Sequence, residues 1–154
     1  MEYHKTQNGT FRAFTNGKRI FKLDILSYDG SYYVDSNDNI QPHNKGKATF
    51  GNGDVYNGEW RDGLMYGHGK LYKKGGNFLE GNFVSNRFEG EGTFANDGFT
   101  DIGTFNNSQL DGFGKRDYSK NRVSHTPLCY RIRSNRLNFT KETLIMGSLR
   151  EKEW

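Results

Sequence analysis

Apolar and polar residues alternate along several short stretches of the chain. In YNGEWR, which begins at Tyr56, aromatic residues and a glycine occupy every second position, with polar residues between them. The stretch GHGKL, which ends at Leu71, alternates in the same way. A period of two residues is typical of a β-strand with one buried face. Asp62-Gly63 lies between the two stretches and is a hairpin turn signal, so the pattern predicts a β-hairpin over residues 56–71.

The hairpin pattern recurs at a period of about 23 residues. Starting from Tyr56, the template is Tyr-x-Gly-x-Trp-x-x-Gly-x-x-x-Gly-x-Gly, and altered copies start at Leu79 and at Asp101. In eroded form, the frame extends upstream to Tyr33, Asp35, Asn37, Asn44 and Gly46, and one unit earlier to Phe14 and Gly17. A repeat of this length predicts a solenoid whose units pack against their neighbours.

The glycines of the template lie on the same face as the aromatic residues. A glycine weakens a strand interior unless an aromatic ring covers it. We therefore expect Gly58, Gly67 and Gly69 to leave room for rings from neighbouring strands. The predicted fold is mainly β, a single-sheet antiparallel solenoid of β-hairpins, with turns between units at residues 74–77 and 96–98.

The last part of the chain is predicted to cap the array. TPLCYRIRSNRLNF alternates apolar residues with arginines and then turns, which indicates a hairpin. TKETLIMGSLREKEW predicts a short helix with Thr140 as its N-cap. The expected organisation is a cap of degenerate hairpins, three clear repeats, and a basic cap of a hairpin plus a short helix, at residues 1–45, 46–118 and 119–154.

These units resemble MORN repeats (membrane occupation and recognition nexus). YNGEWRDGLMYGHGKL is similar to the family motif, and so is the unit from Leu79. The unit from Asp101 departs from the motif by a one-residue deletion and by its leading aspartate. The resemblance implies a hairpin solenoid with grooves that accept extended or helical segments of partner proteins. Choline- and glucan-binding repeats fit less well, because the only tandem aromatic pair, Tyr32-Tyr33, lies in a degenerate unit.

Composition fits a thin, aromatic-rich core. Apolar residues make up only 32% of the chain, but aromatic residues reach 15% and glycine numbers 20. Cys129 is the only cysteine, no apolar run is long enough to span a membrane, and the N-terminus lacks the apolar core of a signal peptide. We expect a cytoplasmic location, with membrane or cytoskeletal association left open.

Signals for catalysis and for bound cofactors are weak. Residues 46–49 (GKAT) lack the upstream glycine of a phosphate-binding loop. His125 and Cys129 have Pro127 between them and no identifiable orienting group. The four histidines do not form a cluster with metal-ligand spacing. We therefore expect no enzyme activity, no cofactor and no metal.

Carboxylates recur at the repeat period on or beside the first strand of each unit. They are Glu59, Glu80 and Asp101. An acid–base pair would need two carboxylates held together in a cleft. Recurrence at the repeat period instead favours a solvated face of the sheet.

Two groups of side chains are candidate binding residues. The aromatic row and its apolar neighbours could contact a partner protein or serve only as core: Tyr56, Trp60, Met65, Phe83, Phe88 and Phe105. Residues 115–154 hold a net charge of +6, and a cluster of arginines there could attract an anionic lipid or could be a solvated face. These arginines are Arg122, Arg131, Arg133 and Arg136.

The leading hypothesis is a non-catalytic scaffold that binds a segment of another protein along its aromatic and glycine face. The alternatives are peripheral binding to anionic phospholipid through the basic C-terminal segment, and a regulatory role beside a separate enzyme. About 36 residues follow the array, too few for a catalytic domain. A homodimer is left open, and nucleic-acid binding is disfavoured because its motifs are scarce.

Overall fold

Every regular element of the described structure is a β-strand. The computed structural model describes residues 6–12, 14–15, 18–19, 21, 24–118 and 128–132. The first strands are β1 (Gln7–Arg12), β2 (Phe14–Thr15), β3 (Lys18–Arg19), β4 (Ile25–Val34), β5 (Ile40–Phe50) and β6 (Val55–Arg61). They are followed by β7 (Leu64–Tyr72), β8 (Phe78–Val84), β9 (Arg87–Ala95), β10 (Thr100–Asn106), β11 (Gln109–Asp117) and β12 (Leu128–Ile132).

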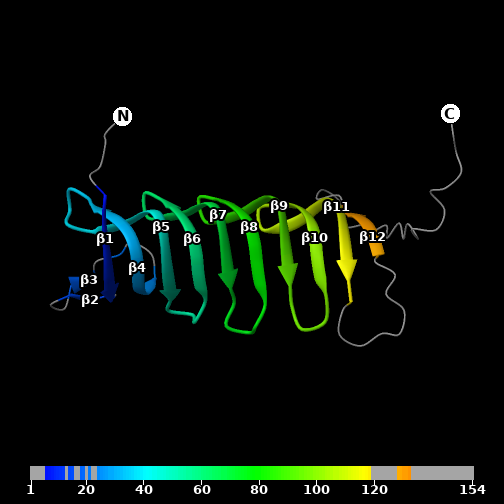
Figure 1. The fold of residues 1–154 in the computed structure, drawn as a ribbon, viewed down its shortest axis with the longest axis horizontal. Helices are drawn as coiled ribbons and strands as arrows, with labels where there is room; N and C mark the ends of the chain where they lie inside the picture. The colour runs from blue at the N-terminus through cyan, green and yellow to red at the C-terminus, as the bar shows by residue number, and fades with distance from the viewer. Residues whose placement is uncertain are drawn as a thin grey trace, which may run out of the picture.

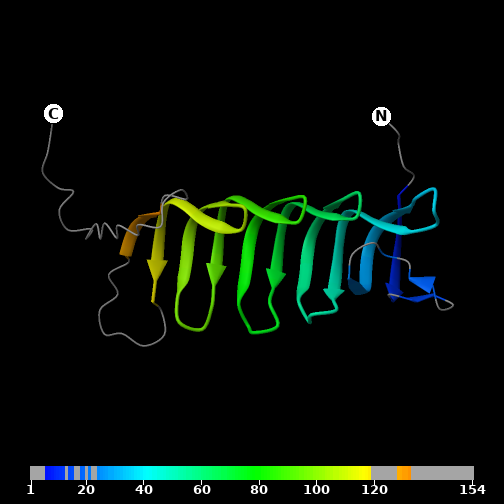
Figure 2. The same cartoon turned by 180° about the vertical axis from the view of Figure 1, so that it is seen from behind.

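Ten of these strands form one antiparallel sheet in the order β1-β4-β5-β6-β7-β8-β9-β10-β11-β12. Strands β2 and β3 pair only with each other. The large sheet is a single row of strands along the long axis of the molecule, with β1 and β12 at its opposite ends (Figure 1). The view from behind shows that the strands bend over at one end of the hairpins and that the small β2–β3 sheet lies beside the first strands (Figure 2). The predicted fold class, a single-sheet solenoid of β-hairpins, is confirmed.

A column of paired glycines crosses nine of the ten strands of the large sheet. Each of nine consecutive strands places one glycine opposite the glycine of the next strand: Gly9, Gly30, Gly46, Gly58, Gly69, Gly81, Gly92, Gly103 and Gly114. Only at β12 does the column end, where Tyr130 pairs with Gly114. If one strand slipped by one residue against its neighbour, all its side chains would turn to the other face of the sheet. The unbroken column therefore shows that these nine strands pair in one consistent register.

Aromatic rings cover the glycines of the column from Gly9 to Gly92, as the sequence predicts for Gly58 and Gly69. A Cβ added to Gly58 would lie 2.6 Å from the Tyr56 hydroxyl oxygen, and one added to Gly69 would also overlap that ring. The ring of Phe88 occupies the same kind of space above Gly92. We call the face that carries these rings the inner face and the opposite side the outer face.

Gly67 has a different role, and the prediction that a ring covers it is wrong. It has a φ of +64°, and an added Cβ would meet the carboxylate of Glu59 instead of a ring. The register between β6 and β7 shifts between Gly58 and Trp60, next to this residue. Gly67 therefore supplies the left-handed conformation that a β-bulge requires.

The hairpin turns of the three clear repeats have two residues with positive φ. These pairs are Asp62-Gly63, Ser85-Asn86 and Asn107-Ser108. Positive φ at both central residues identifies type I′ turns, whose twist matches that of the strands.

The second residue of each turn also binds the preceding repeat. The Asn86 N–H donates to the Met65 carbonyl (3.1 Å), and the Asn86 side chain accepts from the Met65 N–H (2.8 Å). Ser108 makes the same pair of bonds with Phe88. Gly63 lacks a side chain to accept, but its counterpart in the preceding unit is Pro42, which has no N–H to donate.

The frame expected for the first units is right for Asn44 and Gly46, which take the places of Gly67 and Gly69, but it is wrong for the strand before them. Tyr28, not Tyr33, is the counterpart of Tyr56: both lie opposite Ala48, and each hydroxyl donates to a carbonyl three residues ahead. The turn after β4 spans residues 35–39, which is longer than the two-residue turns and displaces the frame. Phe14 lies in the separate β2–β3 sheet.

The predicted C-terminal cap is described only in part. Strand β12 pairs with β11, so one strand of the expected terminal hairpin belongs to the large sheet. The remainder of the predicted hairpin, the predicted helix at residues 140–154, and Gly17 of the expected frame lie outside the described residues.

Candidate functional site

The aromatic residues predicted to bind a partner lie in the core. Their side chains contact one another edge to face along the array, with ring centroids 5.1 Å apart for Tyr56–Trp60, 5.0 Å for Tyr56–Phe83 and 4.6 Å for Phe88–Phe105. The Trp60 indole N–H donates to the Gly46 carbonyl (3.0 Å), which links neighbouring units. The structure therefore brings the predicted row together on the inner face.

All six members of that row are buried. Their exposed fractions run from 0% for Tyr56 and Phe88 to 8% for Met65. So little exposed area gives a docked partner almost nothing to contact in this conformation. Packing is what the structure shows for these side chains, and their contact with a partner stays a prediction.

The predicted arginine cluster falls largely outside the described residues. Arg122, Arg133 and Arg136 are not described, and Arg131 is described only as a backbone position in β12, opposite Phe113. The anion-binding role of these arginines stays a prediction.

Asp101 was interpreted as part of a solvated face, and this is wrong. It lies on the inner face at the position that Tyr56 occupies in its repeat, and it is only 4% exposed. The Arg116 guanidinium binds its two carboxylate oxygens at 2.6 and 2.7 Å and lies over the Phe99 ring. A paired carboxylate replaces the aromatic residue here, so it can remain buried.

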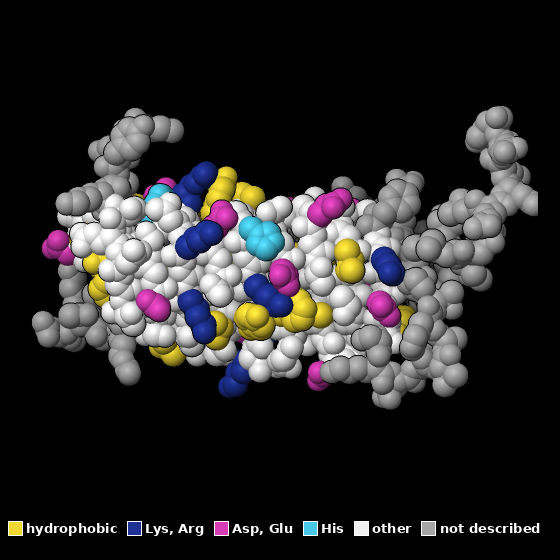
Figure 3. All heavy atoms as spheres, in the orientation of Figure 1, with side chains coloured by type: hydrophobic (Ala, Val, Ile, Leu, Met, Phe, Trp, Pro, Cys, Tyr) yellow, Lys and Arg dark blue, Asp and Glu magenta, His cyan; other side chains and the backbone are white. Residues whose placement is uncertain are grey.

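The outer face carries the exposed charged and apolar side chains. Basic, acidic and hydrophobic side chains lie interspersed over the middle strands of one face (Figure 3). Lys70 on β7 and Glu80 on β8 are cross-strand partners and form an ion pair of 3.0 Å. That hydrogen bond, more than the opposing effect of burial, raises the pKa of Lys70. The Lys70 ammonium also lies over the rings of Tyr72 and Phe78.

A shallow open groove of about 920 Å³ crosses the outer face from β7 to β11. Its lining includes the glycine backbone together with His68, Glu80, Glu91, Thr93, Ile102, Thr104 and Asp111. Three of these side chains are carboxylates, and none is a lysine or an arginine. Ile102 is 51% exposed, which is high for a large apolar side chain. The groove is therefore acidic and contains one accessible apolar contact.

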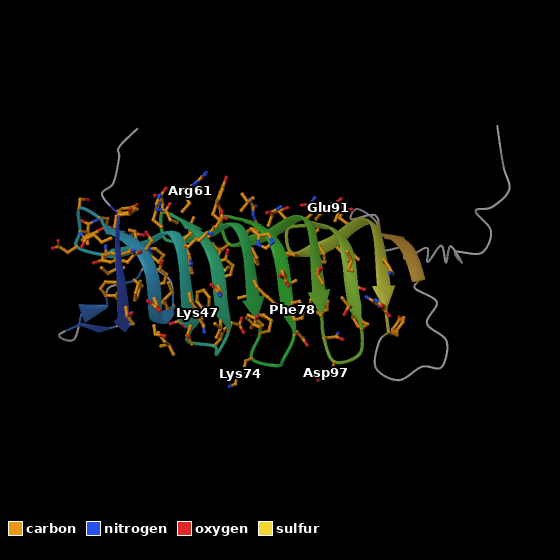
Figure 4. All side chains as sticks on the ribbon, in the orientation of Figure 1. Lys47, Arg61, Lys74, Phe78, Glu91 and Asp97 are labelled. Atoms are coloured by element: carbon orange, nitrogen blue, oxygen red, sulfur yellow. The ribbon has the colours of Figure 1, made fainter. Side chains whose placement is uncertain are left out.

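Charge is distributed unevenly along the array. Residues 39–78 carry six basic and three acidic side chains, whereas residues 79–112 carry one basic and six acidic side chains. The acidic part coincides with the strands that line most of the groove. Figure 4 labels one charged residue of each part: Lys47 in the basic part (residues 39–78) and Glu91 in the acidic part (residues 79–112).

Acidic residues at the loops stabilise turns. The Asp35 carboxylate accepts hydrogen bonds from the backbone N–H groups of Asn37 (2.9 Å) and Asn39 (3.0 Å) and from the Gln41 amide (2.7 Å). These bonds, led by the one from Asn39, hold the pKa of Asp35 well below its usual value. Burial works to raise the pKa of Asp54, but its bonds from Lys73 and Lys74 outweigh this and lower it. Both carboxylates have structural partners.

The described residues contain neither a metal-binding cluster nor a helix that could cross a membrane. No group of three or more His, Cys, Asp or Glu side chains in the described ranges is placed to hold a metal ion. No helix of the described part is long and apolar enough to cross a membrane.

Comparison with known protein families matches four segments of the chain to the MORN repeat, at residues 39–55, 56–78, 80–98 and 102–121. Together they cover just over half of the sequence. The chain belongs to the MORN-repeat family. MORN-repeat proteins often take part in protein or membrane interactions and are generally non-catalytic. The first matched MORN segment extends the array upstream of the three units that were clearest in the sequence.

The residues of the outer groove were not singled out as binding residues by the sequence. Glu80, Glu91 and Asp111 belong to three different strands and come together only through the register of this MORN array. One signal was available: the stretch from Leu79 to Gly112 contains a single cation, Arg87, among six carboxylates.

Proposed function

We propose that this MORN-repeat protein is a non-catalytic scaffold that binds a segment of another protein. The observation that carries the proposal is the single sheet of ten strands, whose outer face has no covering element among the described residues (Figure 1). Exposed apolar side chains lie on it, including Tyr72 at 45% and Ile102 at 51% exposure. Accessible apolar groups with charged neighbours are the usual composition of a protein interface.

The outer face supports the proposal better than the inner face does. The inner-face rings are used in packing one MORN unit against the next, and a partner that displaced them would disrupt the core. The outer-face side chains can be covered without any rearrangement of the sheet. We therefore place partner contact mainly on the outer face, with the aromatic row acting as its rigid support.

Co-purification tests the proposed function. The tagged chain would be isolated from its native source at moderate salt, together with a variant that carries Tyr72→Ser and Ile102→Ser. Circular dichroism and the unfolding midpoint would establish that both baits are folded. We expect a protein that co-purifies in a fixed ratio with the native chain and is depleted with the variant. Equal recovery of every protein with both baits would contradict the proposal.

Binding to anionic phospholipid is a second candidate, and one feature of the described residues favours it. Lys70 lies over the rings of Tyr72 and Phe78, and Lys74 is exposed in the adjoining loop. Cations beside accessible aromatic rings suit the surface of an anionic membrane. Flotation with vesicles that contain phosphatidylserine would test this candidate, since Lys70→Gln with Lys74→Gln should reduce the bound fraction if these lysines contribute.

A further inference from the structure

One row of side chains on the outer face is complementary to itself about its middle. Cross-strand pairing sets eight residues side by side, one on each strand from β4 to β11: Asp29, Lys47, Asn57, Lys70, Glu80, Thr93, Ile102 and Lys115. The residues at equal distances from the middle form four pairs: Lys70 with Glu80, Asn57 with Thr93, Lys47 with Ile102, and Asp29 with Lys115. Two pairs have opposite charges and none has like charges, and the stem of a lysine can cover an apolar side chain.

The neighbouring row of the outer face has its aromatic rings at the same middle. Tyr72 on β7 and Phe78 on β8 are cross-strand partners with ring centroids 6.3 Å apart, and Tyr72 is 45% exposed. Val55 and Ala95 occupy the next positions of this row, on β6 and β9. Figure 3 shows hydrophobic side chains gathered beside a basic one over the middle of the array. An apolar centre with charged surroundings is the usual anatomy of a protein interface.

An interface between two copies related by a two-fold axis must be complementary to itself, because every contact occurs twice. If the axis runs parallel to the strands and passes between β7 and β8, each strand faces the strand at an equal distance on the other side of the middle. Lys70 then faces Glu80 of the second copy, and Asp29 faces Lys115 of the second copy. An axis along the array would instead set each charge against its own counterpart, so the charges select the first arrangement.

We propose that two copies of this chain associate through their outer faces, about a two-fold axis between β7 and β8. Tyr72 of each copy contacts Phe78 of the other, and the charges at the ends fix the alignment. Neighbouring strands lie about 4.8 Å apart, so contact from β4 to β11 extends over about 34 Å. Among the described residues, Lys115 has no hydrogen-bond or ion-pair partner and the Asp29 carboxylate accepts only from Thr10, so both can bind across the interface.

Sedimentation equilibrium of the purified chain alone tests the inference. We expect a dimer whose fraction rises with protein concentration and falls as salt is added, because exposed ion pairs are screened. Asp29→Lys should weaken the dimer about tenfold, since symmetry creates two like-charge pairs in each dimer. Lys115→Asp should weaken it to a similar degree. A chain that stays monomeric at every concentration, or a dimer that neither variant affects, would overturn the inference.

Exchanging the two charges within one chain gives a rescue variant. Asp29→Lys combined with Lys115→Asp restores opposite charges across the interface and should return the dissociation constant close to the native value. Circular dichroism and unfolding midpoints would establish that every variant is folded. Asp38→Asn removes a charge from the exposed turn after β4, outside the row, and should leave the dimer unchanged. Single variants that weaken the dimer without recovery in the double variant would show that the two residues do not meet.

One position is expected to oppose the dimer. Glu59 on β6 and Glu91 on β9 lie at equal distances from the middle, in the row nearer the hairpin turns, so they face each other across the interface. Glu91→Lys replaces two like-charge pairs by opposite pairs and should strengthen the dimer about threefold. Unchanged or weaker association of this variant would overturn the proposed axis.

The inference goes beyond the proposed function, because the occupant of the outer face is a second copy and not a different protein. Two outcomes separate them. If the purified chain is a monomer and a different protein co-purifies with it, self-association is overturned and the scaffold proposal stands. If the purified chain dimerises as expected and no different protein co-purifies, this inference stands and the scaffold proposal is overturned.

Discussion

Tyr56 shows how one side chain can join several strands of this sheet. Its ring covers Gly58 on its own strand and Gly69 on the next, and it contacts the rings of Trp60 and Phe83. Its hydroxyl donates to the Glu59 carbonyl at 3.0 Å, so the buried polar atom is satisfied. Burial, together with the nearby charge of Glu59, raises the pKa of Tyr56 above its usual value. The hydroxyl therefore keeps its proton, and its hydrogen bond to Glu59, in more alkaline solution than an exposed tyrosine would.

Gly69→Ala should destabilise the protein. The added methyl group would overlap the Tyr56 ring, and relief would require the ring or the backbone to move. Overpacking of this kind costs about 1–3 kcal/mol of the free energy of unfolding. Urea unfolding followed by tryptophan fluorescence would measure it.

Gly75→Ala is the matched control for that substitution. Gly75 lies in the exposed turn after β7, and nothing lies within 4 Å of an added Cβ. Its effect should stay within about 0.5 kcal/mol. Similar losses for the two alanine variants would show that ring cover does not explain the glycine at position 69.

Asp35→Asn should lower stability in a pH-dependent way. The pKa of Asp35 is depressed in the folded protein by the N–H groups that it accepts from. Its stabilising effect is therefore fully present above the unfolded pKa of about 3.9 and is lost as the pH falls through the lower folded value. Thermal melts of both proteins from pH 7 to pH 2 should show a gap in midpoint that narrows progressively as the pH falls below about 4. A gap that is constant over this range would contradict the proposed cause.

At the scale of the hairpin, the turn residue is also a connection between repeats. Asn86 and Ser108 hold a positive φ, and each accepts a hydrogen bond from a backbone N–H of the preceding unit. Asparagine tolerates the left-handed region better than most residues. Asn86 and Ser108, which stand where glycine would also fit the turn, therefore each make a side-chain hydrogen bond that glycine cannot make.

Asn86→Gly and Asn86→Ala should separate the two contributions. Glycine keeps the backbone conformation but leaves the Met65 N–H without its acceptor, at a cost of about 1–3 kcal/mol. Alanine loses the same bond and adds strain from the positive φ of 68°. We expect unfolding midpoints in the order native, Asn86→Gly, Asn86→Ala. If the glycine variant equals the native protein, the bond between units contributes nothing.

The hairpins of residues 56–117 could be predicted from the sequence because alternation and the spacing of the repeats indicate the same boundaries. The first hairpin of the array could not be placed by a fixed period. The motif Tyr28-x-Gly30-x-Tyr32 matches Tyr56-x-Gly58-x-Trp60, but the longer turn puts 28 residues between their tyrosines. A search by motif, without a fixed period, would have found it.

The candidate site was less predictable than the fold. Alternation assigns side chains to one of two faces, but it does not show whether the face with the rings is exposed to solvent or buried. The predicted binding row proved to be buried, and Asp101 proved to be paired inside the core. The groove is lined by residues from β7 to β11, such as Glu80 and Asp111, and depends on how these strands pair with one another. Alternation within a single strand does not reveal how strands pair.

At the scale of the whole molecule, each repeat contacts mainly its two neighbours. Stability in such an array is approximately a sum of unit and interface contributions, so terminal units open more readily than central ones. Hydrogen exchange should therefore be slowest in β6 to β9 and faster in β1. Uniform protection from β1 to β9 would show that the sheet opens only as one cooperative unit.

The glycine column makes the length of this protein adjustable in fixed steps. Because every strand of the column presents the same small residue at the same height, a copy of residues 56–78 could be inserted between β7 and β8 without a change of register. Each inserted copy would add two strands and lengthen the array by about 9.6 Å. The number of repeats therefore sets the length of the array, and with it the distance between any two molecules bound at its ends.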